Sequence, residues 1–319
     1  MSESPLQASA KLAGWLKGGG SVAITGASGW VGRAMTHLAL EVLGPEAPSR
    51  LRLLGSSERP FELLGQAMPL ESLDKAAPLG PGEWLVLHLA VVGPKRMPDA
   101  ERRRAINEAM LADALALAAT GEVRRFVSAS SGAVALPAQD HPDRQAYGDL
   151  KRDKEQIVRA WSARTGVPAL FPRIYNLGGP YMNHAARYVL GNFIRQTLAG
   201  GAVRIEAPRP VLRSYVHVLE FARVTYDLAL DAGPTQAFDT AGTEVLELSE
   251  LAAAVGRALG RPDLAIERPP LETEAPDSYV GDGNVYRAAL AASGAQQAGI
   301  ERIVRDTAAW LQASGQVGD

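Results

Sequence analysis

The chain has 319 residues, with 33 Lys and Arg against 35 Asp and Glu, and no cysteine. At roughly 100–200 residues per domain, this length predicts one large domain or two smaller ones. The lack of cysteine excludes a disulfide scaffold, a zinc site with thiolate ligands and a cysteine nucleophile. A net charge of −2 gives no basic field for generic nucleic-acid binding. With no signal-peptide core and no apolar run of about 20 residues, we expect a cytoplasmic protein that does not span a membrane.

Apolar runs of strand length alternate with helical patterns through the first half of the chain. The expected strands are 21–25, 51–54, 84–92, 125–129 and 168–174, and the expected helices are 5–17, 31–43, 98–120 and 145–164. This alternation predicts an α/β fold with a doubly wound parallel sheet covered on both faces.

Beyond about Tyr175 the rhythm changes, and glycine and proline become frequent. Strands are expected at 203–206 and 237–240, and helices at 220–230, 248–259 and 300–312. The pattern predicts a first domain of residues 1–175 and a smaller C-terminal substrate-binding region of residues 176–319. Residues 213–245 are expected to fold back onto the first domain.

A glycine-rich turn follows the first expected strand and opens the next helix. Its sequence is TGASGWVG, residues 25–32. Gly26 permits a tight turn, Gly29 lets the backbone approach a pyrophosphate, and Gly32 allows close packing of helix on strand. The free N–H groups of the helix N-terminus then face the anion. Between a strand and a helix, this turn predicts a Rossmann-type dinucleotide site; the alternative is a purely structural turn.

The end of the second expected strand bears on the choice between NAD and NADP. An acid there would bind the ribose 2′-hydroxyl, whereas arginine accommodates a 2′-phosphate. The sequence is GSSER, residues 55–59, with no acid directly after the strand. Ser56 and Arg59 therefore favour NADP(H) slightly. Glu58 weakens this preference, and the alternative is that Arg59 is a solvated loop residue.

Tyr147 and Lys151 form a YxxxK pair on an expected helix, so that both side chains share one helix face. A nearby cation favours a phenolate and lowers the pKa of a tyrosine toward the range of an acid/base catalyst. Ser131 follows the strand 125–129, at the sheet edge where open α/β sheets bind ligands. The three residues predict an acid/base site; the alternatives are surface side chains at helical spacing and an ordinary turn serine.

These motifs, in this order, resemble the extended short-chain dehydrogenase/reductases of the NAD-dependent epimerase/dehydratase family. The resemblance covers about residues 20–312 and includes HLA at residues 88–90 and Asn107 in the following helix. The segments RIYNLGGP (173–180) and RSYVHV (213–218) resemble two later motifs of the family. Departures are the missing Thr-Asp-Glu of the dehydratase branch, a short stretch between Ser131 and Tyr147, and Gly178 where a tyrosine is common.

The resemblance implies an NAD(P)-dependent oxidoreductase or epimerase that transfers hydride at a hydroxyl or keto carbon of a nucleotide-linked sugar. Tyr147 would be the acid/base, Lys151 would lower its pKa, and Ser131 would orient the substrate oxygen. Asn176 and Arg213 would contact the substrate, Arg213 at the diphosphate. The cofactor-binding residues implied are Gly26, Ser28, Gly29, Trp30, Val31, Gly32, Ser56, Arg59, Leu89, Ala90, Asn107, Tyr147 and Lys151.

Two other functions stay open at this point. The short stretch before Tyr147 favours an NADPH-dependent reductase of a non-sugar carbonyl compound, and a non-catalytic dinucleotide-binding sensor would need only the glycine turn. The five histidines have no metal-ligand spacing, so we expect no metal. The apolar faces of helices 98–120 and 145–164 resemble the family's dimer interface and imply a homodimer.

Overall fold

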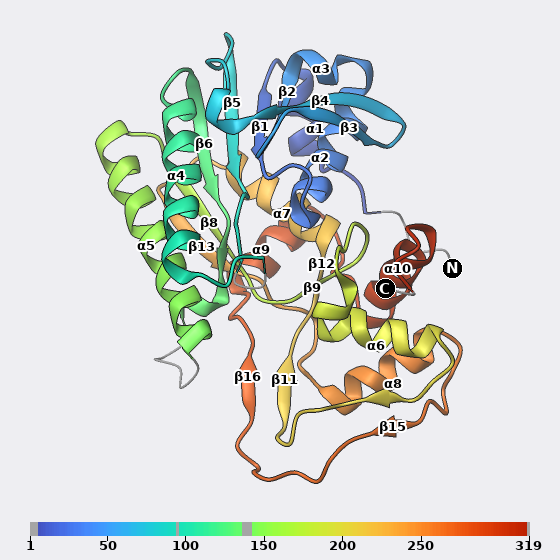
Figure 1. The fold of residues 1–319 in the computed structure, drawn as a ribbon. Coiled ribbons are helices and arrows are strands. Elements are labelled where there is room, and N and C mark those ends of the chain that lie inside the picture. Colours follow the sequence, from blue (N-terminus) through green and yellow to red (C-terminus); the bar gives the residue numbers. More distant parts are fainter. Residues whose placement is uncertain (1–5, 94–95, 136–141, 318–319) are drawn as a thin grey trace. The chain divides into compact units, whose positions relative to one another are not determined.

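The computed structural model describes residues 6–93, 96–135 and 142–317. They form two compact units, coloured along the chain in Figure 1. The first unit holds the described residues through Ile174 together with Ala222–Phe238, and the second holds Tyr175–Phe221 and the described residues from Asp239 onward. The segment that returns to the first unit is thus shorter than the expected 213–245. Strands on either side of it pair within the second unit instead.

The first unit is built on a sheet in the order β13-β8-β6-β5-β1-β2-β4-β3, with β7 paired to β8. The strand pairs from β4 through β2, β1, β5 and β6 to β8 are parallel. β3 runs antiparallel to β4. The strands are β1 (Ser21–Thr25), β2 (Leu51–Gly55), β3 (Arg59–Leu63), β4 (Gln66–Ser72), β5 (Glu83–His88), β6 (Glu122–Ser128), β7 (Ser130–Ser131), β8 (Ala169–Ile174) and β13 (Gln236–Asp239). The expected doubly wound, mostly parallel sheet is confirmed.

Helices cover this sheet because successive strand residues point to opposite faces. Figure 1 shows α4 and α5 side by side, and they pack on β5, β6 and β8. Helix α2 packs on β1 and α1, and Tyr226 of α7 donates to the Met35 carbonyl of α2 at 3.0 Å. The helices are α1 (Ala10–Lys17), α2 (Trp30–Leu43), α3 (Ala47–Arg50), α4 (Ala100–Ala118), α5 (Pro142–Thr165) and α7 (Val218–Leu230).

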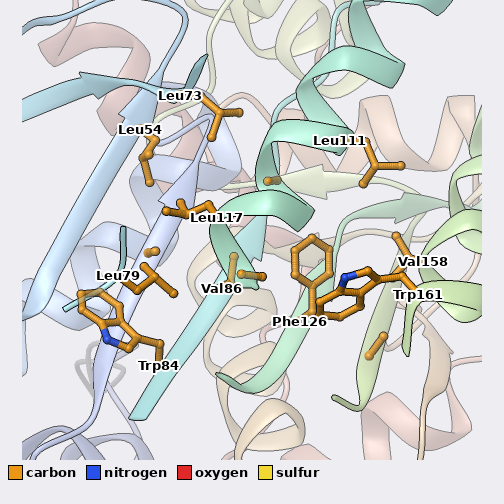
Figure 2. Close-up of a cluster of buried hydrophobic side chains, with 14 of the residues drawn as sticks. Leu54, Leu73, Leu79, Trp84, Val86, Leu111, Leu117, Phe126, Val158 and Trp161 are labelled. Atoms are coloured by element: carbon orange, nitrogen blue, oxygen red, sulfur yellow. The ribbon is translucent and has the colours of Figure 1, made fainter. Parts of the chain in front are cut away.

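The core under α4 and α5 fixes these helices on the strands that lead to the site. Figure 2 shows Phe126 of β6 against Trp161 of α5, with ring centroids 5.3 Å apart. Val86 and Phe126 are fully buried, and Leu111 and Leu117 of α4 are nearly so. Burial of each large side chain of this kind stabilises the fold by about 1.5–3 kcal/mol.

Arg125 anchors the segment that returns to the first unit. Its side chain is 2% exposed, and its guanidinium donates to the carbonyls of Ala229, Asp231, Gly233 and Pro234 at 2.7–3.2 Å. These carbonyls lie at and beyond the end of α7, where a helix leaves acceptors without intrahelical donors. The buried guanidinium therefore supplies hydrogen-bond donors to the carbonyl groups between α7 and β13.

The described part of the second unit contains short strands and four longer helices. β11 (Val211–Arg213) lies between β14 (Leu246–Glu247) and β16 (Asp277–Tyr279), while β9 (Leu177–Gly178) pairs with β12 (Val216–His217), and β10 (Val203–Arg204) with β15 (Ile266–Glu267). The helices are α6 (Val189–Leu198), α8 (Leu248–Ala258), α9 (Asn284–Ala292) and α10 (Ile300–Ala313). Helix α10 packs on both α6 and α8.

Candidate active site

The turn between β1 and α2 leaves no room for a side chain at Gly26 or Gly32. Gly26 has a φ of +72°, and a β-carbon on it would lie 2.8 Å from the backbone nitrogen of Ala90. A β-carbon on Gly32 would lie 2.2 Å from the Gly26 carbonyl oxygen. Gly29 is the N-cap of α2 and has no side-chain cap, so the first N–H groups of the helix stay open to an anion. The turn therefore fits the pyrophosphate of a dinucleotide.

Two arginines converge on Ser28 in this turn. Arg59, the first residue of β3, donates from Nη2 to the Ser28 Oγ at 2.9 Å, and Arg33 of α2 donates from Nε to the Ser28 carbonyl at 3.3 Å. The Arg33 guanidinium also lies 5.0 Å from the ring centroid of Phe61. Ser56 is exposed in the bend after β2. Sequence reasoning selected Ser56 and Arg59 but missed Arg33, which directly follows the third glycine of the motif.

The end of β5 closes the other side of the turn. β5 ends at His88, four residues before the expected end, and Leu89 and Ala90 then pass close to Gly26. The His88 Nδ1 lies 2.9 Å from the Thr25 hydroxyl, and burial together with two lysines holds the pKa of His88 well below its usual value. A neutral imidazole therefore lies under the cofactor turn.

Asn107 of α4 fixes the loop that follows β5. Its Oδ1 accepts from the Val92 N–H at 3.0 Å, and its Nδ2 donates to the Val92 and Arg103 carbonyls at 3.0 and 2.8 Å. The amide is thus committed to the loop backbone, and through that loop it shapes the cofactor side of the site.

Ser131, Tyr147 and Lys151 come together at the carboxyl end of β6 and β7. Tyr147 forms a side-chain hydrogen bond with Ser131, and the Lys151 Nζ lies 5.6 Å from the centroid of the Tyr147 ring. Lys151 also donates to the Ala129 carbonyl at 3.3 Å. The structure thus brings together the three side chains that the sequence predicts for acid/base chemistry.

The electrostatics of this group differ from the expectation in one respect. Burial raises the pKa of Tyr147, and the hydrogen bond from Ser131 opposes that rise only in part. Burial also lowers the pKa of Lys151 to about 8, opposed by the carboxylate of Glu155. The pKa of Tyr147 is therefore raised here, opposite to the predicted lowering by Lys151, because desolvation of the phenol is the largest influence on it.

A buried ion pair behind the serines was not predicted. Glu155 of α5 accepts from the Ser130 Oγ at 2.6 Å and from Arg173 of β8 through two hydrogen bonds of 2.9 Å. The Glu155 side chain is 6% exposed, and its pKa is lowered by Arg173 and Ser130 although burial acts in the opposite direction. The available signal was its position: four residues after Lys151, it lies on the same face of the helix as Tyr147 and Lys151.

The two residues expected at the substrate lie in the second unit, around Tyr279. Asn176 donates to the carbonyls of Ser214 and Tyr279 at 3.1 and 3.3 Å. Arg213 pairs with the Asp277 carboxylate at 3.1 Å and donates to the Asp277 carbonyl at 2.8 Å, with its guanidinium 5.8 Å from the Tyr279 ring centroid. The second unit therefore brings Asn176 and Arg213 to one place.

Comparison with known proteins identifies the family. The sequence model described as "NAD dependent epimerase/dehydratase family" matches residues 22–238, which is more than half of the chain. The chain belongs to this family. Its members are NAD-dependent enzymes of the extended short-chain dehydrogenase/reductase type.

Curated relatives and solved structures of this family resemble the chain at low identity. UDP-glucuronic acid decarboxylases 6 and 3 of Arabidopsis thaliana are 28% and 29% identical over 124 and 109 residues, 39% and 34% of the chain. The matched stretches span about a third of the length of those relatives, 36% and 32%. The Methanobrevibacter ruminantium UDP-N-acetylglucosamine 4-epimerase bound to UDP-N-acetylmuramic acid has a TM-score of 0.71 at 16% identity, over 92% of this chain and 98% of the epimerase. WbmF of Bordetella bronchiseptica with NAD⁺ has a TM-score of 0.72 at 17% identity, over 94% of each chain.

The structure explains one departure from the family pattern. A β-carbon on Gly178, where the family commonly has tyrosine, would lie 2.2 Å from the Ile303 Cγ2 and 2.7 Å from the Leu190 Cδ2. Helices α10 and α6 therefore occupy the space of the missing side chain. The shortened stretch between Ser131 and Tyr147 includes residues 136–141, which lie outside the described part of the chain.

Two further properties hold for the described residues alone. They hold no group of three or more His, Asp or Glu side chains that could bind a metal ion. None of their helices is both long enough and apolar enough to cross a bilayer.

Proposed function

We propose that the chain is an NAD(P)-dependent oxidoreductase or epimerase acting on a hydroxyl or keto carbon of a nucleotide-linked sugar. The observation that carries this proposal is the group Ser131, Tyr147 and Lys151, with a hydrogen bond between serine and tyrosine. It lies at the carboxyl ends of parallel strands, where α/β sheets bind their ligands. A non-catalytic sensor would have no use for this group.

Each of the three side chains has a distinct task in this proposal. Ser131 holds the reacting oxygen by a hydrogen bond, and Tyr147 moves the proton between that oxygen and its own hydroxyl. Lys151 supplies the positive charge that favours the phenolate once a polar substrate and cofactor replace part of the apolar surroundings. The nicotinamide cofactor supplies or accepts the hydride when bound, held at the Gly26–Gly32 turn and along Leu89 and Ala90.

We propose a slight preference for the cofactor with a 2′-phosphate, NADP(H), whereas several similar structures were solved with NAD⁺, NADH or NAD. Arg59 and Arg33 both reach Ser28, and no acid follows β2 directly. Guanidinium groups bind phosphate oxygens through paired, charge-assisted hydrogen bonds. Arg59→Ala should therefore weaken NADPH binding at least 10-fold and NADH binding less than 3-fold, and equal effects on both would refute the preference.

Nucleotide-linked sugars are the proposed substrates because several similar structures bind them. MoeE5 was solved with UDP-glucuronic acid and with UDP-glucose, both with NAD. We propose that Asn176 and Arg213 make the substrate contacts, Arg213 at the diphosphate. Arg213 would have to exchange its ion pair with Asp277 for the phosphate oxygens.

The test combines binding and turnover. The protein is incubated with UDP-glucose, UDP-N-acetylglucosamine or UDP-glucuronic acid and each oxidised cofactor, and products are followed by mass spectrometry and by absorbance of the reduced nicotinamide. Tyr147→Phe should abolish turnover while the cofactor dissociation constant stays within 2-fold. Turnover that survives Tyr147→Phe would refute the mechanism, and cofactor binding without turnover of any substrate would favour a sensor.

A second candidate is an NADPH-dependent reductase of a non-sugar carbonyl compound. The ion pair between Arg213 and Asp277 favours it, because a carboxylate already meets the guanidinium that a diphosphate would use. Binding of UDP separates the two functions. A site for a nucleotide-linked sugar should bind UDP in the micromolar range, and Arg213→Ala should weaken that binding. A reductase of a non-sugar carbonyl compound should show no binding of UDP.

We also propose a homodimer formed through α4 and α5. Ile157 of α5 and Val91 beside α4 are both 43% exposed although they are apolar. Asp153 of α5, which lines the same cavity as Ile157 and Val91, pairs with Arg104 of α4 at 2.6 Å. Light scattering should give twice the chain mass, and Ile157→Lys should halve it; a concentration-independent monomer would refute the dimer.

A further inference from the structure

Tyr175 and Asp239 form a hydrogen-bonded pair that the proposed function does not use. The Tyr175 Oη donates to the Asp239 Oδ2 at 3.0 Å. Tyr175 directly precedes Asn176, and Asp239 is the last residue of β13; all three belong to the second unit. Both members of the pair are partly exposed. A phenol and a carboxylate therefore lie beside a residue that we propose to contact the substrate.

Contacts from two other segments hold this pair in place. The Tyr175 N–H donates to the Oγ1 of the buried Thr240 at 3.0 Å. The backbone at Gly281 packs directly on the pair, because a β-carbon there would lie 2.8 Å from the Tyr175 Cε2 and 2.9 Å from the Asp239 Cβ. The phenol and the carboxylate are thus fixed before a ligand arrives, which lowers the cost of ordering them on binding.

The ring of Tyr279 connects the pair to the residues expected at the substrate. The centroids of the Tyr175 and Tyr279 rings lie 4.6 Å apart, with the rings tilted by 41°. Asn176 donates to the Tyr279 carbonyl at 3.3 Å, and the Arg213 guanidinium lies 5.8 Å from the Tyr279 ring centroid. Asp239, through Tyr175, therefore belongs to the same cluster as Asn176 and Arg213.

Two acceptor oxygens of this cluster are left over after its internal hydrogen bonds. An ionised carboxylate accepts on both oxygens, and a carboxamide accepts on its single oxygen. The Asp239 Oδ2 accepts from Tyr175, but no group in the described part of the chain donates to the Asp239 Oδ1. The Asn176 Nδ2 donates to two carbonyls, while its Oδ1 accepts from none of the described residues. A ligand that engages both oxygens must present hydrogen-bond donors.

The neighbours of these oxygens favour hydroxyl donors over ammonium donors. An ammonium group would place a second positive charge near Arg213, and like charges repel. A hydroxyl-bearing ring brings no charge, and its C–H groups can pack on aromatic rings such as those of Tyr175 and Tyr279. The cluster therefore combines acceptors for hydroxyl groups, an aromatic surface and a guanidinium, which suits a sugar attached to a diphosphate.

We propose that Asp239 is a specificity-determining residue that accepts a hydrogen bond from a hydroxyl group of the sugar. This inference rests on the proposed function, because it takes the diphosphate to be held at Arg213. Tyr175 is a positioning residue: its hydroxyl occupies the Oδ2 and directs the Oδ1 to the ligand. A hydrogen bond to a carboxylate is about twice as strong as one between neutral groups, so a sugar that lacks this hydroxyl is rejected.

The first experiment compares the binding of UDP and UDP-glucose by isothermal titration calorimetry and needs no turnover. Asp239→Asn should weaken UDP-glucose binding by about 10-fold or more and change UDP binding less than about 2-fold. Tyr175→Phe should weaken UDP-glucose binding by about 3- to 10-fold, again with UDP unchanged. Asp263→Asn, an exposed position of the same unit, is the matched control and should change neither. Equal losses for both ligands, or unchanged UDP-glucose binding in Asp239→Asn, would overturn the proposal.

The second experiment removes the hydroxyl groups of the ligand one at a time, using the 2-, 3-, 4- and 6-deoxy analogues of UDP-glucose. One analogue should bind the wild-type protein about 10-fold more weakly than UDP-glucose and bind Asp239→Asn within about 3-fold of it. The same penalty in both proteins would assign that hydroxyl to another residue and refute the role of Asp239. If the wild-type protein binds neither UDP nor UDP-glucose, the proposed function fails and this inference fails with it. If UDP binds but Asp239→Asn leaves sugar binding unchanged, this inference alone fails.

Discussion

Replacing Glu155 tests whether the buried carboxylate holds the catalytic strand ends together. Glu155→Gln keeps the shape but leaves the Arg173 guanidinium without its counterion and weakens three hydrogen bonds of 2.6–2.9 Å. Removing one partner of a fully buried ion pair costs about 3–5 kcal/mol. Because the Arg173 side chain is 26% exposed and can recover part of its hydration, we expect a loss of about 2–3 kcal/mol in the free energy of unfolding.

Urea denaturation followed by tryptophan fluorescence measures this loss, since Trp161 lies on the same helix. Arg159→Gln is the control: its guanidinium lies 3.7 Å from Glu155 but is 42% exposed, so the loss should stay below about 1 kcal/mol. The double variant Glu155→Gln/Arg173→Gln should be more stable than the sum of the single effects implies, by about 1–2 kcal/mol. Equal losses for Glu155→Gln and Arg159→Gln, or strict additivity, would refute the reasoning.

Three further predictions concern the turn, the returning segment and the pH dependence. Gly32→Ala should abolish dinucleotide binding and lower the free energy of unfolding in urea by more than about 2 kcal/mol, because its β-carbon would lie 2.2 Å from the Gly26 carbonyl oxygen. Gly14→Ala is the control: this position in α1 has open space around it, and the substitution should stabilise the fold by about 0.5–1 kcal/mol. Arg125→Met should cost about 2–4 kcal/mol, because four carbonyls lose their donor, and a loss below 1 kcal/mol would contradict that role. The pKa of Lys151 is lowered in the folded chain, so between about pH 8 and 10.4 the unfolded chain binds more protons than the folded one. The free energy of unfolding should therefore rise with pH in that window. In denaturation curves measured at several pH values, Lys151→Met should flatten this rise.

The elements that the sequence predicted well are those fixed by local pattern. The strand 21–25 matches β1 residue for residue, and the helices expected at 31–43 and 98–120 correspond to α2 and α4 within two residues at each end. Each combines an apolar run or period with a clear end signal, such as Gly44 after α2 or the Asp99 N-cap of α4. Tyr147 and Lys151 also lie on a regular element, the helix expected at 145–164 and observed as α5, which is why their spacing in the sequence was informative.

What the sequence missed depends on contacts between distant segments. The hairpin of β3 and β4 contains prolines at facing positions, Pro60 and Pro69, and its alternation of exposed and buried residues follows from its position at the sheet edge. The partner of Glu155 is 18 residues away on another element. No local period distinguishes these positions from surface ones.

Glu155 connects the stability of the site with its chemistry. The same carboxylate binds Ser130, pairs with Arg173 and opposes the desolvation of Lys151 by favouring its ammonium form. Tyr147, raised in pKa by burial, depends on that ammonium for any gain in acidity. Glu155→Gln should therefore lower the pKa of Lys151 further, measured by NMR titration of ¹³C-labelled lysine with Lys151→Met to assign the signal, as well as destabilise the fold. A protein that loses stability without any shift of the Lys151 signal would have a structural ion pair that is independent of the proton chemistry beside it.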